Sequence, residues 1–272
     1  MNKNPKITYE VEDSVAIITI NRPERKNALD GETLEMLNTA MDLAEEDLNI
    51  KAIIITGTGN TFSSGFDLKD QLEKSPKGKE WKSILDLDFK TIMRFWHSPK
   101  PTIAAVRGAC LAGAFELALA CDITIASKDA FFGEPELRFG AGIVTMILPW
   151  VTGVKAAKEI ILLGKDNIPA EEALRLGLVT RLTETNLLQK KAKEIALNLA
   201  EIDPNLIKDT KKAINQSYEV QGLLKSLQNS LDIDYEIESK GSPDKIRFME
   251  IARNQGMKEA IAYRNRRFKP DA

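Results

Sequence analysis

The chain has 272 residues, of which 43% are hydrophobic and 29% charged, so one large globular unit with a sizeable core is expected. The formal net charge of −2 provides no broad attraction for nucleic acids or anionic membranes, and we expect neither as a partner. No apolar secretory segment follows the N-terminus, and the two cysteines, Cys110 and Cys121, lie in an apolar run. We therefore expect a cytoplasmic protein with reduced core thiols.

Short apolar runs alternate with helical patterns along the first two thirds of the chain. Strands are predicted at residues 15–20, 52–56, 102–106 and 123–126. Between the first two of these strands, one face of a helix capped by Asp30 is formed by Leu34, Leu37, Met41 and Leu48. Alternation of strands and helices predicts an α/β core with parallel strand pairing.

The sequence changes in character after Asp203 and Pro204. Residues 204–272 contain no strand-like run and read as helices, with a break at residues 241–243. We therefore expect an α/β core over residues 1–203 and an α-helical region over residues 204–272. An apolar stripe on one of these helices needs a surface to bury it, and it consists of Leu223, Leu224, Leu227 and Leu231.

Glu116 is the only charged residue in the apolar run 108–121, which we expect to form a helix from about residue 112. Removing an ionised carboxylate from water is costly unless it is paired, hydrogen-bonded or protonated. A second acid, Glu136, follows another apolar stretch, residues 131–133. Two carboxyl groups in apolar surroundings predict acid–base chemistry. The alternative is a tightly packed helix whose Glu116 is satisfied by an arginine.

Two glycine-containing segments could present free backbone N–H groups to a ligand. Gly113 lies near the expected start of the Glu116 helix, where N–H groups have no partner within the helix. Gly65 permits an unusual backbone angle after the second strand, which would leave the Phe66 N–H free to point outward. Together, the N–H groups of Phe66 and Gly113 would form an oxyanion hole for a thioester carbonyl. By itself, a strand–glycine–helix junction is also common scaffolding.

Taken together, the motifs resemble the crotonase (enoyl-CoA hydratase/isomerase) superfamily over almost the whole chain. The matching segments, in chain order, are residues 21–23, 27–29, 62–68, 101–108, 112–118, 121–122, 132–136, 256–257 and 267–269. The resemblance implies a crotonase-like spiral of ββα turns, followed by an α-helical trimerisation region whose apolar stripe packs on neighbouring subunits. It also implies a coenzyme A thioester as substrate, no permanently bound cofactor, and a homotrimer or a dimer of trimers.

The resemblance assigns roles to individual residues. Glu116 would deprotonate a water that attacks C3, and Glu136 would protonate C2 while the oxyanion hole holds the thioester oxygen. The residues expected at coenzyme A are Lys26, Ala28, Ser64, Asp67, Leu68 and, from a neighbouring subunit, Lys269. A single histidine and two apolar cysteines leave little for a transition-metal site, so no metal is expected.

Departures from the family pattern leave the acyl group open. Residues 137–150 are shorter and bulkier than the glycine-rich segment usual in hydratases. Phe66 stands where a small residue is usual after Gly65, and Phe115 precedes Glu116. Two alternatives to enoyl-CoA hydration therefore remain. One is an isomerase, a CoA-ester hydrolase or a cyclic dienoyl-CoA hydratase on the same scaffold. The other is a crotonase-like protein that only binds coenzyme A or RNA.

Overall fold

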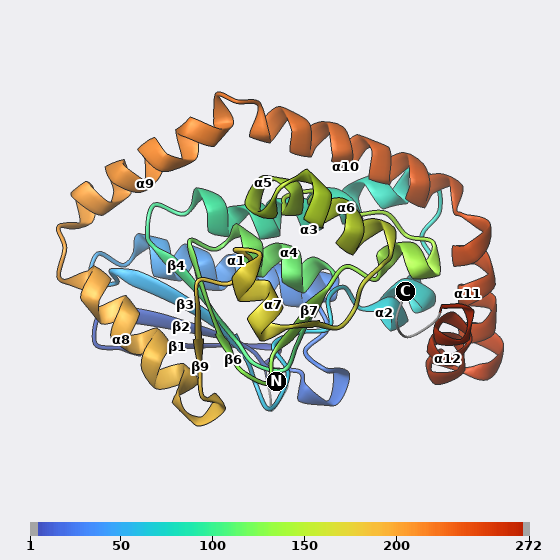
Figure 1. Ribbon diagram of the computed structural model, residues 1–272, viewed down its shortest axis with the longest axis horizontal. Coiled ribbons are helices and arrows are strands. Elements are labelled where there is room, and N and C mark those ends of the chain that lie inside the picture. Colours follow the sequence, from blue (N-terminus) through green and yellow to red (C-terminus); the bar gives the residue numbers. More distant parts are fainter. Residues whose placement is uncertain (1–4, 269–272) are drawn as a thin grey trace.

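The computed structural model describes residues 5–268 as an α/β core crossed by a chain of C-terminal helices (Figure 1). The strands are β1 (Ile7–Glu12), β2 (Val15–Ile20), β3 (Ala52–Gly57), β4 (Thr102–Val106), β5 (Ala109–Leu111), β6 (Ile123–Ser127), β7 (Phe131–Gly133), β8 (Ile168–Pro169) and β9 (Arg181–Thr183). The helices of the core are α1 (Gly31–Glu46), α2 (Leu68–Lys74), α3 (Glu80–His97), α4 (Gly113–Ala120), α5 (Leu148–Thr152), α6 (Val154–Leu162), α7 (Ala170–Arg175) and α8 (Leu188–Ala200). The C-terminal helices are α9 (Pro204–Glu219), α10 (Leu223–Lys240), α11 (Pro243–Gln255) and α12 (Met257–Arg267).

The larger sheet has the strand order β1-β2-β3-β4-β6-β9, with β1 antiparallel to β2 and the other pairs parallel. Side chains alternate between its two faces. In β3, Ile53 and Ile55 pack into the main core, whereas Ala52 and Ile54 pack on the opposite face with residues of α8. A strand buried on both faces reads as a continuous apolar run, which is why it was recognisable in the sequence.

The four predicted strands are confirmed as β2, β3, β4 and β6. Asp30 caps α1 as expected, because its Oδ1 accepts a hydrogen bond of 2.9 Å from the backbone N–H of Thr33. The prediction for Leu48 is wrong: α1 ends at Glu46, and Leu48 lies beyond it with 84% of its surface exposed. The prediction continued the helical spacing of apolar residues to Leu48, two residues past the end of α1.

A second, smaller sheet determines where the isolated acids meet. Its strands β5 and β7 are parallel and Leu111 pairs with Gly133, so both strands end at the same edge. The chain leaves β5 into α4, which carries Glu116, and leaves β7 into the segment with Glu136. The parallel register therefore brings together residues from the two apolar runs.

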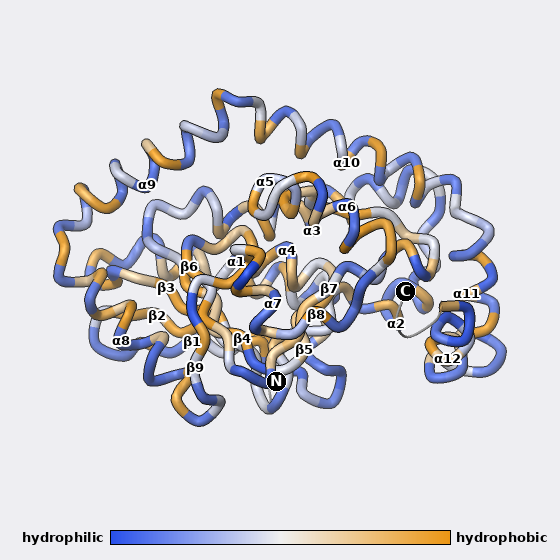
Figure 2. The backbone as a smooth tube through the Cα atoms, viewed as in Figure 1, coloured by the Kyte–Doolittle hydropathy of each residue, from blue (hydrophilic) through white to orange (hydrophobic). Residues whose placement is uncertain are grey.

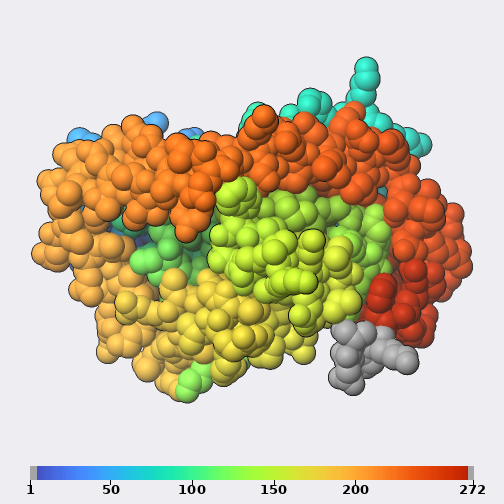
Figure 3. All heavy atoms as spheres, turned by 45° about the horizontal axis from the view of Figure 1, so that its top comes forward, coloured from blue at the N-terminus to red at the C-terminus, as the bar shows by residue number. Residues whose placement is uncertain are grey.

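The C-terminal helices are helical as predicted, with the expected break between α10 and α11 at Gly241. Helices α9 and α10 form a continuous ridge over the core, and α11 and α12 lie at its end (Figures 1 and 3). The expected burial of the leucine stripe on a neighbouring subunit is wrong for three of its residues. Leu223, Leu227 and Leu231 pack into the core of their own chain.

Hydrophobic residues concentrate in the sheets and in α4, whereas most of the C-terminal helices alternate between apolar and polar residues (Figure 2). Cys110 and Cys121 are buried free thiols, as expected. Within residues 5–268, no helix is both long and apolar enough to cross a membrane.

The loop after β2 is fastened by two buried polar side chains. Asn27 is fully buried, and its Nδ2 donates to the carbonyl oxygens of Thr58 and Thr61 at 3.0 and 2.7 Å. Its Oδ1 accepts from the Arg22 N–H at 2.9 Å. The Arg22 guanidinium bonds to Asp67, at the start of α2, at 2.9 Å. These contacts hold the segments that carry most of the predicted coenzyme A residues.

Replacing Asn27 by alanine is expected to lower the free energy of unfolding by about 2–4 kcal/mol, because buried backbone groups lose their partners. Asn27 also has a φ of 55°, which asparagine tolerates better than alanine. Urea unfolding of Asn27→Ala, with exposed Asn49→Ala as the control, measures the difference. A loss no larger than that of the control would contradict the assigned role.

Candidate active site

Three buried carboxyl groups converge where β5 and β7 end. Glu116 comes from α4, and Glu134 and Glu136 follow β7; one oxygen of each lies within 4.8 Å of one oxygen of the other two. Their exposures are 1%, 1% and 6%. Glu116 Oε2 accepts a hydrogen bond of 2.8 Å from the Thr145 N–H. Among the described residues, Glu116 Oε1, both oxygens of Glu134 and Glu136 Oε2 have no partner.

The environment favours the protonated form of all three acids. Burial, followed by the charge of Glu136, raises the pKa of Glu116 well above its ordinary value. Burial and the charges of Glu136 and Glu116 do the same to the pKa of Glu134. Burial raises the pKa of Glu136 to about 8. Carboxyl groups so close together in a dry site cannot all ionise, so the cluster retains protons near neutral pH.

Sequence analysis identified Glu116 and Glu136 but missed Glu134. The signal was present, because Glu134 follows the same apolar run as Glu136. The two residues are separated only by Pro135, after which a 3-10 helix begins at Glu136. This turn lets both side chains reach Glu116, which residue spacing alone could not establish.

The two proposed oxyanion donors are also brought together. Within residues 5–268, the N–H groups of Phe66 and Gly113 donate to no protein acceptor. Gly65 has a φ of 85° and Ala112 a φ of 57°, so both preceding residues adopt the left-handed half of conformational space. The Phe66 ring lies against Gly113, where an added Cβ would be 2.3 Å from the ring. Glycine is therefore needed at 113, and the Phe66 ring forms a wall beside the donors.

A cavity of about 580 Å³ adjoins these groups. Its wall includes Phe66, Ala112 and Glu136, whereas Glu116 lies next to Glu136 rather than on the wall itself. Five of the residues predicted to bind coenzyme A also line this cavity, namely Lys26, Ala28, Ser64, Asp67 and Leu68. Lys269 lies outside the described residues. The structure thus places five of the six predicted coenzyme A residues and one predicted acid around a single space.

Asp67 has a structural task as well as a place on the cavity wall. Its Oδ1 accepts from the N–H groups of Lys69 and Asp70, at 3.0 and 3.3 Å, and so caps α2. Its Oδ2 pairs with Arg22. Arg22 was noted in the sequence only as part of a motif, and its buried ion pair was not foreseen.

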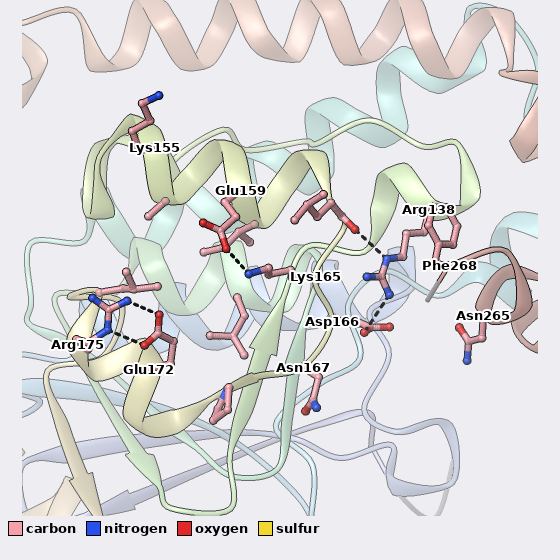
Figure 4. Close-up of a pocket in the computed structure, with 16 residues that line it drawn as sticks. Arg138, Lys155, Glu159, Lys165, Asp166, Asn167, Glu172, Arg175, Asn265 and Phe268 are labelled. Atoms are coloured by element: carbon pink, nitrogen blue, oxygen red, sulfur yellow. Dashed lines mark hydrogen bonds and ion pairs between the residues drawn. The ribbon is translucent and has the colours of Figure 1, made fainter. Parts of the chain in front are cut away.

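A larger cavity, of about 840 Å³, lies beside α6, α7 and the end of α12 (Figure 4). Its charged side chains pair largely with each other: Arg138 with Asp166, Lys165 with Glu159, and Arg175 with Glu172. The three clustered acids do not line it. Size alone therefore does not identify the site. The smaller cavity is the better candidate, because Glu136 and Phe66 line it.

The three carboxyl groups are also the grouping of described residues that could hold a metal ion. Carboxylate oxygens suit hard cations such as Mg²⁺ and Ca²⁺. Binding one would require these acids to release protons that their surroundings favour retaining. Proton transfer is the chemistry to which the cluster is better suited.

Comparison with known proteins identifies the family. The sequence model described as enoyl-CoA hydratase/isomerase matches residues 10–253. A short-chain-enoyl-CoA hydratase of Clostridium acetobutylicum is 38% identical over 216 residues, which are 77% of this chain and 81% of that protein. An (E)-benzylidenesuccinyl-CoA hydratase of Thauera aromatica is 37% identical over 212 residues, 76% of this chain and 81% of that protein.

Among solved structures, an enoyl-CoA hydratase/isomerase from Xanthobacter autotrophicus Py2 is 58% identical, with a TM-score of 0.97. The match covers 97% of this chain and 99% of that one. These findings confirm the resemblance drawn from the sequence motifs and the α/β crotonase fold with its helical C-terminal part. The chain belongs to the enoyl-CoA hydratase/isomerase family.

Proposed function

We propose that the protein adds water across the C2=C3 double bond of a 2-enoyl-CoA. The observation that carries this proposal is the position of protonatable buried acids beside two backbone N–H groups that donate to no acceptor within residues 5–268. Hydration needs a base for water, an acid for C2 and stabilisation of negative charge on the thioester oxygen. The names of the hydratase relatives agree with this choice.

In the proposed reaction, the thioester carbonyl oxygen accepts hydrogen bonds from the N–H groups of Phe66 and Gly113. The reacting form of the cluster is the one in which Glu116 carries a negative charge and Glu136 a proton, and this ionised Glu116 takes a proton from water as the water oxygen forms a bond to C3. Protonated Glu136 then gives its proton to C2, and the proton taken up by Glu116 passes back to Glu136, so that one water molecule is added in total and the acids return to their starting state. The Thr145 N–H holds Oε2 of Glu116 and leaves Oε1 free for the water.

Coenzyme A would lie along the part of the cavity wall formed by Lys26, Ala28, Ser64 and the start of α2, with Lys269 of a neighbouring subunit at a phosphate. No resident cofactor or metal takes part in this mechanism, because the acids and the oxyanion donors supply each step. We place the protein in the cytoplasm. Unchanged turnover in the presence of a chelator would support the metal-free mechanism.

The alternatives on the same scaffold differ in their products. An isomerase would move the double bond, and a hydrolase would release free coenzyme A. A protein that only binds coenzyme A would cause no loss of enoyl absorbance from crotonyl-CoA or from a wider panel of linear and cyclic enoyl esters. Analysis of the products by mass spectrometry separates all these reactions, because hydration alone adds the mass of one water.

We also propose a homotrimer or a dimer of trimers. The support is the family resemblance together with apolar side chains left exposed on the C-terminal helices. Val220 is 84% exposed, and Ile214 of α9 and Ile233 of α10 are also exposed. Large apolar side chains left exposed on successive helices would be covered in such an assembly.

Glu116→Gln and Glu136→Gln should each lower kcat by about 100-fold or more, because each removes a proton-transfer group. Binding of the CoA ester should change only a few-fold. Steady-state kinetics and calorimetry measure the two effects, with exposed Glu236→Gln as the control. Near-normal turnover by either variant on a substrate that the wild type hydrates would remove that residue from the mechanism.

Glu134→Gln should change how stability depends on pH. Below the ordinary pKa of 4.5, the carboxyl group is protonated in both folded and unfolded chains, so the variant should resemble the wild type. As pH rises, the unfolded chain loses this proton while the folded chain retains it, and wild-type stability falls. The variant should therefore be more stable by about 1–3 kcal/mol at pH 8.

Urea unfolding between pH 4.5 and 8 measures this difference, with exposed Glu201→Gln as the control. A difference between variant and wild type that does not change with pH would show that Glu134 ionises normally in the folded protein.

Light scattering should give a mass of three or six chains. Ile214→Glu combined with Ile233→Glu should reduce that mass, because charges at an apolar contact oppose association. Leu48→Glu, which alters a residue exposed after α1, should leave the mass unchanged. A fully active monomer would refute the proposed assembly.

A further inference from the structure

The cavity beside the acid cluster extends between α3 and the C-terminal helices, where more acidic side chains line its wall. These are Asp88 of α3 and Asp234 and Glu238 of α10. Glu238 forms an ion pair with Lys245 of α11. Asp88 and Asp234 form no ion pair with any residue that the structure describes. This part of the cavity therefore has hydrogen-bonding capacity that the protein does not use.

Of these two aspartates, Asp234 is the one with buried carboxyl oxygens that lack hydrogen-bond partners among the described residues. It is 2% exposed, and neither of its carboxyl oxygens has a partner among residues 5–268. The facing backbone is shaped to admit it: a Cβ added to Gly142 would lie 1.9 Å from Asp234 Oδ1. Because unpartnered buried polar groups are rare in folded proteins, a ligand that enters the cavity is the natural partner.

Asp234 lines the same cavity as the reacting acid Glu136. Its charge contributes to the raised pKa values of Glu116 and Glu136, and to that of Asp88. Burial and the charge of Glu238 raise the pKa of Asp234 itself to about 7, although Lys245 opposes the shift. A group on an acyl chain that occupies this cavity could therefore meet Asp234.

The remaining wall is apolar and includes Trp81, Leu85 and Val144. A plain hydrocarbon chain would suit these residues but would leave both aspartates without partners. A carboxylate on the acyl chain would have to lose its own hydration beside a group of acidic side chains. An ammonium group would have to lose its own hydration in a site that favours neutral carboxyl groups. A hydroxyl group avoids each problem, because it can donate to a carboxylate and accept from a carboxylic acid.

We propose that the preferred acyl group bears a hydroxyl group, which Asp234 and Asp88 bind inside the cavity. This inference rests on the proposed function, since it assumes that the cavity takes the acyl part of a CoA thioester. A site built to hydrogen-bond a substrate hydroxyl discriminates strongly against the analogue that lacks it, because its buried polar groups are then left unpaired.

The test uses saturated CoA esters, so that binding is measured without turnover. Calorimetry compares hexanoyl-CoA with 5-hydroxyhexanoyl-CoA and 6-hydroxyhexanoyl-CoA. The wild type should bind at least one hydroxylated ester about tenfold or more tightly than hexanoyl-CoA. Asp234→Leu should lose this preference, and Asp234→Asn should keep part of it because an amide still forms hydrogen bonds.

Asp232→Leu is the matched control, since Asp232 is an exposed acid on the same helix. Thermal unfolding of each variant accompanies the binding measurements. Asp234→Leu should be at least as stable as the wild type, because an unpartnered carboxyl group is replaced by an apolar side chain of similar size. If that variant fails to fold, Asp234→Asn and Asp88→Leu provide the comparison.

Equal or weaker binding of both hydroxylated esters by the wild type would overturn the inference. So would a hydroxyl preference that persists in both Asp234→Leu and Asp88→Leu. Failure of the proposed function looks different: the hydroxylated esters would bind preferentially, yet the corresponding 2-enoyl esters would gain no water.

Discussion

The exclusion of water from three neighbouring carboxyl groups is the constraint on which the site depends. Each of Glu116, Glu134 and Glu136 would be ionised at neutral pH if it were exposed. Burial and proximity prevent all three from ionising together, because charges so close together in a medium of low polarity repel each other strongly. The same exclusion of water strengthens the hydrogen bonds that the Phe66 and Gly113 N–H groups can offer to a ligand. Protonated acids and effective oxyanion donors thus have one physical cause.

The rest of the fold maintains this exclusion. Parallel pairing of β5 with β7 brings Glu116 to the two later acids, and Thr145 fixes one oxygen of Glu116. Asn27 and Arg22 fasten the loops on the other side of the cavity. Helices α10 and α11 contribute to its wall, so the C-terminal part of the chain helps to form the site of its own subunit. As pH rises, the unfolded chain releases the protons of these acids while the folded chain retains them, so the buried cluster lowers the stability of the protein at neutral pH.

Much of the core could be predicted from the sequence. Strands buried on both faces can be recognised in the sequence as apolar runs. The capping side chain of Asp30 indicates where α1 begins. The isolation of Glu116 and Glu136 and the glycines at 65 and 113 pointed to the acids and the oxyanion donors, and the family resemblance supplied the coenzyme A residues that line the cavity.

Other features depend on contacts between distant segments and could not be read from local patterns. Glu134 joins the cluster only because the turn at Pro135 directs it toward Glu116. Leu223, Leu227 and Leu231 have the same pattern whether they pack on a partner or on their own core, and the structure shows the latter. Nothing in the local sequence around Asp234 marks it as a cavity residue. Its place opposite Gly142 follows from the path of α10 across the molecule.

The most direct measurement is an infrared titration of the carboxyl groups in the folded protein, compared with Glu136→Gln and Glu134→Gln. The account predicts bands of protonated carboxylic acids at pH 7, one of which disappears near pH 8 in the wild type and is missing in Glu136→Gln. A wild-type spectrum with all carboxyl groups ionised at pH 7 would contradict it.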